Sequence, residues 1–113
     1  MFKQTKKKID LIYYLKNFNL VNLTEASTSD FQSIFILICQ DYFSHQISIS
    51  TFSFLAGELY LPSIEKNCDQ ELICILDLAQ DLSYQFKQDR THYFLFLKEI
   101  MTFYLNYSSQ QSG

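Results

Sequence analysis

The stretch LICILDLAQDLSYQF, residues 72–86, is the most regular in the chain and decides its fold class. Its apolar side chains recur at steps of three and four residues, the spacing that gathers them on one face of an α-helix. Those side chains are Leu72, Ile75, Leu76, Ala79, Leu82 and Phe86. Acidic and amide side chains occupy the other faces of the same cylinder. The pattern predicts an amphipathic helix whose apolar face covers a core.

The composition extends this helical prediction to the whole chain. A chain of 113 residues is the size of one domain, and 48% apolar residues with 17% aromatic ones are enough for a self-supporting core. The sequence has two glycines and one proline, whereas an all-β protein of this length needs many tight turns. We therefore expect one all-α domain over residues 1–113, a compact bundle of four to five helices, with flexible ends at 1–4 and 108–113.

Apolar periodicity, capping residues and the single proline define the boundaries of the expected helices. In the first of them the expected apolar face contains Ile9, Ile12 and Tyr13. The expected helices are residues 5–18 capped by Thr5, a helix from a cap at Thr28 or Ser29 to 44–46, a helix from a cap at Ser48 or Ser50 to 61–62, residues 69–86, and residues 92–107 capped by Thr91.

Residues 47–54, ISISTFSF, permit two interpretations. The strict alternation of apolar and polar residues is typical of a strand. A helix is also consistent, because a serine cap at Ser48 or Ser50 precedes an apolar face with Phe52, Leu55 and Leu59. We favour the helix, since an isolated strand has no partner for its backbone hydrogen bonds.

No residue pattern indicates catalysis or a cofactor site. A catalytic His45 or His92 would need a Ser, Cys or carboxylate brought alongside it by the fold, and nothing in the local sequence marks one. The chain also lacks a glycine-rich phosphate loop, a GXSXG motif and a CXXC motif. Asp77 and Asp81 share one helix face and could bind a divalent ion, but no second acidic pair of the EXXH type accompanies them. We expect a solvated acidic face there, and a protein that is not an enzyme and uses no cofactor.

The cysteines and the apolar runs suggest a location. Cys39, Cys68 and Cys74 follow no metal-ligand spacing and form no even disulfide set. Cys39 and Cys74 lie in apolar runs, which predicts buried free thiols in a reducing compartment. No secretory signal is visible, and no apolar run approaches the ~18 residues of a membrane span. These features favour a cytoplasmic protein without a membrane segment.

The charge of the chain is divided unevenly. The formal net charge is −3, but from Ile9 onward five basic residues face twelve acidic ones, a net charge of −7. Such a body repels phosphate backbones, which argues against nucleic acid as a ligand, and it attracts a basic protein surface. The best candidate for partner contact is an acidic corner around Pro62. Its residues are Glu58, Tyr60, Glu65, Asp69 and Glu71.

The stretch YFSHQISISTFSFL, residues 42–55, joins a helix exit to an Ile-Ser start with a phenylalanine about one turn later. It resembles the helix junction of the small helical colicin-type immunity proteins, over 14 residues and without a specific motif. Together with the charge, this favours a small acidic inhibitor-like or immunity-like protein that docks on a basic partner. The alternative is a structural or homo-oligomeric subunit that associates through its aromatic C-terminal helix. The homodimer contacts would then come from Tyr93, Phe96 and Phe103.

Overall fold

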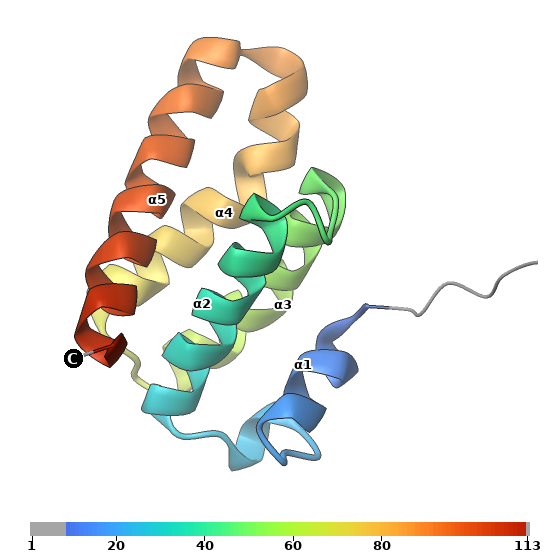
Figure 1. Ribbon diagram of the computed structural model, residues 1–113, viewed down its shortest axis with the longest axis vertical. Coiled ribbons are helices and arrows are strands. Elements are labelled where there is room, and N and C mark those ends of the chain that lie inside the picture. The colour runs from blue at the N-terminus through green and yellow to red at the C-terminus, as the bar shows by residue number, and fades with distance from the viewer. Residues whose placement is uncertain (1–8, 113) are drawn as a thin grey trace, which may run out of the picture.

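The computed structural model describes residues 9–112, and their regular structure is entirely helical. Five α-helices and one 3₁₀ turn follow one another along the chain (Figure 1), which confirms the predicted all-α bundle. Their bounds are α1(Leu11–Asn17), η1(Leu23–Glu25), α2(Thr28–Phe43), α3(Ile49–Glu65), α4(Gln70–Gln88) and α5(Arg90–Ser112).

The core lies where α2, α3, α4 and α5 meet, and α1 packs against α2 at the edge of the bundle (Figure 1). The most extensive packing is between α3 and α4, followed by that between α4 and α5. Three aromatic rings connect α2, α3 and α5 in this core. The centre of the Phe35 ring of α2 lies 6.1 Å from that of Phe52 in α3 and 6.0 Å from that of Phe103 in α5. The apolar face predicted for residues 72–86 is buried apart from Phe86, which is half-buried.

Serine side chains start both α2 and α3. The Ser27 hydroxyl accepts the backbone N–H of Asp30, and the Asp30 carboxylate accepts the N–H of Ser27, each at 3.0 Å. This reciprocal capping box begins α2 one residue before the earliest predicted cap. Ser48 caps α3 through one bond of this kind, in which its hydroxyl accepts the N–H of Thr51 at 3.1 Å. Residues 49–54 are therefore helical, and the strand interpretation is wrong.

Pro62 lies inside α3, so the prediction that this helix ends at 61–62 is wrong. Proline removes the N–H that would reach the Glu58 carbonyl and its ring crowds that carbonyl, but its fixed φ is compatible with a helix. The following turn is held by other bonds. The Lys66 N–H donates to the Pro62 carbonyl at 2.9 Å, and the buried Ser63 hydroxyl donates to the Tyr60 carbonyl at 2.6 Å.

The first helix is shorter and rotated relative to the expectation. It is capped by Asp10, whose carboxylate accepts the Tyr13 N–H at 3.1 Å, while the predicted Thr5 cap lies outside the described residues. The expected face residue Ile12 is 58% exposed, and Tyr14 is buried instead. Tyr14 determines this rotation, because its hydroxyl donates to the Asp41 carboxylate of α2 at 2.7 Å.

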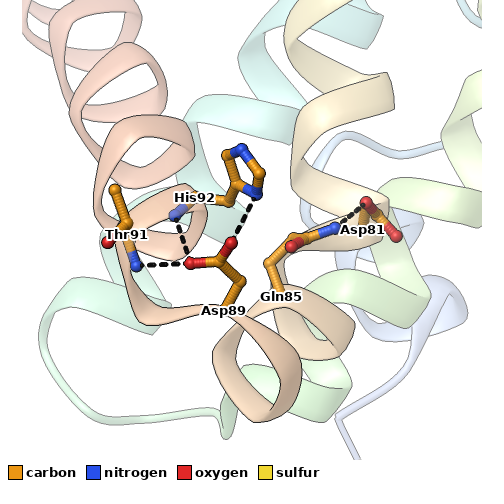
Figure 2. A network of polar contacts seen from close by, with 5 residues as sticks. All are labelled: Asp81, Gln85, Asp89, Thr91 and His92. Carbon is orange, nitrogen blue, oxygen red and sulfur yellow. Dashed lines mark hydrogen bonds and ion pairs between the residues drawn. The ribbon is translucent and has the colours of Figure 1, made fainter.

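Asp89 forms the corner between α4 and α5 (Figure 2). Its carboxylate accepts the backbone N–H groups of Thr91 at 3.0 Å and His92 at 3.3 Å, so α5 begins before the predicted Thr91 cap. The same carboxylate lies 2.9 Å from the His92 ring. At its other end α5 continues to Ser112, past the predicted end at Tyr107 and into the segment expected to be a tail.

A side chain from α3 is inserted into the backbone of α4. The Ser53 hydroxyl donates to the Ala79 carbonyl and accepts the Ser83 N–H, both at 2.9 Å. In a regular α-helix that N–H and that carbonyl would bond to each other. Insertion of a side chain into this ladder is a known cause of helix bending. Figure 1 shows α4 bending near its middle.

Candidate interaction surface

The acidic charge is most concentrated on the α3–α4 pair. Between residues 58 and 81 the chain carries six acidic side chains and one basic one, Lys66. The Lys66 ammonium donates to the backbone carbonyl of Thr24 at 2.9 Å. The only cation of this segment is therefore directed towards the η1 turn. The six acidic residues are Glu58, Glu65, Asp69, Glu71, Asp77 and Asp81.

The outer face of α3 combines acidic and large apolar side chains. We call it the α3 outer face, and its residues follow at steps of three and four, the spacing of one helix face. Phe54 and Leu61 are each 64% exposed, although large apolar side chains usually lie inside. Glu58 and Glu65 lie two helical turns apart on the same face, about 10 Å along the helix axis. The members of the face are Phe54, Gly57, Glu58, Leu61 and Glu65.

A surface hollow of about 390 Å³ interrupts this face. Glycine at position 57 contributes no side chain to it, and Gln80 of α4 lines the opposite side. Its lining residues are Ser53, Phe54, Gly57, Glu58 and Gln80. The hollow therefore has one exposed aromatic ring and one carboxylate at its rim, on the helix pair that carries most of the acidic charge.

Glu58 is the most electrostatically perturbed acid of this surface. Partial burial raises the pKa of its carboxyl above the usual 4.5, and the negative charge of Asp10 at the start of α1 raises this pKa further. Both effects disfavour the charged form of Glu58. A cation placed beside Glu58 would therefore offset the repulsion between the Glu58 and Asp10 carboxylates and form an ion pair with Glu58.

The acidic corner predicted around Pro62 is divided between two places. Glu58 and Glu65 belong to the α3 outer face. Tyr60 lies away from that face, half-buried against the core. Asp69 and Glu71 lie beside α5, where the Tyr107 hydroxyl donates to Glu71 at 3.3 Å. Partial burial and these two carboxylates raise the pKa of Tyr107.

Asp77 and Asp81 are each engaged by a neighbouring amide. Gln80 donates to Asp77 at 2.9 Å, and Gln85 donates to Asp81 at 3.0 Å (Figure 2). The two aspartates line a second hollow of about 360 Å³ together with Phe96. Across the described part of the chain, no group of three or more His, Cys, Asp or Glu side chains is arranged to hold a metal ion.

The aromatic residues proposed for self-association through α5 are mostly internal, which corrects that prediction. Tyr93 is 9% exposed and Phe103 is 2% exposed, because their rings pack on Phe86 and Phe35. Phe96 is half-buried. The large apolar side chains that α5 presents to solvent are different ones. They are Phe94, Leu95, Met101 and Leu105.

The three cysteines are free thiols, as predicted, but their burial differs from the prediction. Cys39 is buried, and burial raises the pKa of its thiol well above 9.0. Cys68 is also buried, although it follows no apolar run. Cys74 is exposed, because it lies off the buried face of α4 despite its apolar neighbours in sequence.

Sequence reasoning found the two glutamates of the α3 outer face but missed Phe54, Gly57 and Leu61. A signal for them was present. Phe54 and Leu61 are seven residues apart and fall outside the apolar set that was assigned to the core. Apolar residues that repeat on a second face of a helix indicate either a wider core or a surface that binds something.

No family model, curated protein or solved structure matches this chain. The resemblance of residues 42–55 to immunity proteins stays a prediction from the sequence. Within residues 9–112, no helix combines the length and apolar character needed to cross a membrane.

Proposed function

We propose that this protein is a non-catalytic binding module that docks on a basic partner protein through the α3 outer face, in the manner of an inhibitor or immunity protein. One observation carries the proposal. Glu58 and Glu65 lie on this face, four further carboxylates lie between residues 69 and 81, and the one lysine of this segment, Lys66, is turned to the Thr24 carbonyl. Exposed carboxylates of one sign steer a partner of opposite charge and speed its association.

The apolar residues of the α3 outer face can supply binding affinity, to which exposed charges contribute little. Charge–charge contacts at an exposed surface contribute little affinity, because water and salt screen them. Phe54 and Leu61 can bury apolar area on contact, and large apolar side chains at the centre of an interface contribute most of its binding energy. The α3 outer face therefore has acidic groups for attraction and two large side chains for affinity.

Charge reversal at matched positions tests this proposal. A partner is first captured at low salt from a lysate of the source organism and purified, and its association rate is then measured by stopped flow. We expect Glu65→Lys to slow association about tenfold at low ionic strength and to flatten the salt dependence.

Glu99→Lys on α5 is the control, because it makes the same change of charge at another exposed position. It should leave the rate nearly unchanged. An acidic partner, or equal slowing by both substitutions, would show that the α3 outer face is not the docking site.

Self-association through α5 is the second candidate function. Phe94, Met101 and Leu105 are exposed and share one face of α5, beside a hollow of about 310 Å³. That hollow lies against the end of α2 and is lined by Tyr42, Phe43, His45, Leu97 and Met101. The mass measured by light scattering during size-exclusion chromatography tests it. A dimer that Met101→Glu dissolves supports this candidate, and a monomer at ~100 μM contradicts it.

A further inference from the structure

Gly57 is a glycine that the fold does not require. It lies within α3, where glycine lowers helix stability relative to alanine. Its backbone is not in the left-handed region. A Cβ atom placed there would meet only the Gln80 side chain, at 3.4 Å from Oε1 and 3.8 Å from Cβ. These are ordinary contacts with a flexible side chain, so neither backbone geometry nor internal packing explains this glycine.

The surroundings of Gly57 give it a shape that can receive a side chain. Phe54 precedes it by nearly one turn and Leu61 follows it by just over one turn, and both stand out into solvent. The hollow of about 390 Å³ lies beside Phe54 and Gly57, with Glu58 and Gln80 among its lining residues. The α3 outer face thus presents a notch at Gly57, between the Phe54 ring and the Gln80 side chain of α4, with the Glu58 carboxylate beside it and Glu65 two turns further along α3.

We propose that this notch receives a bulky apolar side chain from a cationic helix of the partner protein, which lies along α3 with its lysines or arginines facing Glu58 and Glu65. This inference rests on the proposed function and identifies the partner's contact segment. A glycine at a helix–helix contact lets a side chain of the facing helix enter deeply. The charge complementarity determines the sign of the partner segment.

A helical segment is the occupant that the spacing fits. Glu58 and Glu65 repeat at the two-turn interval, and basic residues seven apart on a facing helix repeat at the same interval of about 10 Å. An apolar residue in the same turn as the basic residue that faces Glu58 would then lie at the notch, because Gly57 directly precedes Glu58. Amphipathic helices bind grooves in other proteins through apolar anchors at this kind of spacing.

The test uses a synthetic helical peptide of about 18 residues, close to the length of α3. It is built from alanine and lysine with leucine on one face, and a second peptide has glutamate in place of lysine. Binding is measured by calorimetry. We expect the lysine peptide to bind and the glutamate peptide not to bind. Gly57→Ala should weaken binding of the lysine peptide at least about fivefold, because a methyl group fills the notch.

The same Gly57→Ala protein should melt at a higher temperature than the wild type, which separates loss of binding from loss of folding. Asn106→Ala on α5 is the control, since it also improves helix propensity but lies outside the α3 outer face. It should not change binding. Phe54→Ala, at an exposed position, should weaken binding as Gly57→Ala does.

The outcomes separate the two proposals. In one outcome, the Gly57→Ala and Phe54→Ala proteins bind the lysine peptide as well as the wild type does, while Glu65→Lys binds it more weakly. This outcome would overturn the proposal that the notch receives a side chain, and it would leave the acidic docking surface in place. Equal binding of the lysine and glutamate peptides would overturn both.

Discussion

At the scale of single residues, Glu58 shows how a surface suited to binding reduces the stability of the free protein. Burial and the Asp10 charge raise the pKa of its carboxyl above 4.5. A raised folded-state pKa means that the folded protein holds this proton more tightly than the unfolded chain does. The stabilising contribution of Glu58 is therefore complete below about pH 4.5 and is lost as the pH rises through the folded-state pKa.

This linkage predicts how Glu58→Gln behaves. The variant should gain stability relative to the wild type as the pH rises from about 4 to about 7. Urea unfolding of both proteins at the two pH values measures the difference. Glu65→Gln serves as a control for the loss of a surface charge. An identical stability difference at both pH values would contradict the cause assigned to the Glu58 shift.

At the scale of elements, one hydroxyl group of α3 is bonded to the backbone of α4 within their extensive contact. The Ser53 side chain bonds both the Ala79 carbonyl and the Ser83 N–H. While α4 stays bent, Ser53→Ala leaves these two backbone groups without their partner, and we expect a loss of about 1–3 kcal/mol in the free energy of unfolding. Chemical denaturation measures this loss.

Ser83→Ala is the matched variant, because it also removes a serine hydroxyl but keeps the backbone N–H that Ser53 contacts. It should change stability by less than about 0.5 kcal/mol. If the two variants lose equal stability, the inserted hydroxyl does not maintain the bend of α4.

At the scale of the whole molecule, the helix packing determines which thiols react. Cys39 and Cys68 are buried and Cys74 is exposed. We expect one thiol per chain to react quickly with a thiol reagent in the folded protein, and three to react in denaturant. Cys74→Ser should abolish the fast reaction. A single reactive thiol in denaturant without reductant would reveal a disulfide, and three fast thiols in the folded state would show that the bundle is not closed.

The sequence by itself determined the fold class and most of the helices. Apolar residues at steps of three and four along 72–86 predict α4. The predicted cap at Thr28 or Ser29 locates the start of α2 to within one or two residues, and Ser48 locates the start of α3. These signals are local, because a helix face and a cap are formed by residues within one or two turns of each other. For the candidate site, the same local reasoning located Glu58 and Glu65.

Contacts between distant parts of the chain decided the rest. The Asp41 carboxylate determines which side of α1 is buried, through Tyr14. Phe35 packs against Phe103 and helps to bury it, so the face of α5 that is exposed to solvent is not the expected one with Tyr93, Phe96 and Phe103. Helix periodicity gives the angle between side chains but not the direction of the core. Packing against other elements sets that direction. This packing is the reason why Phe54, Gly57 and Leu61 lie on an outer surface.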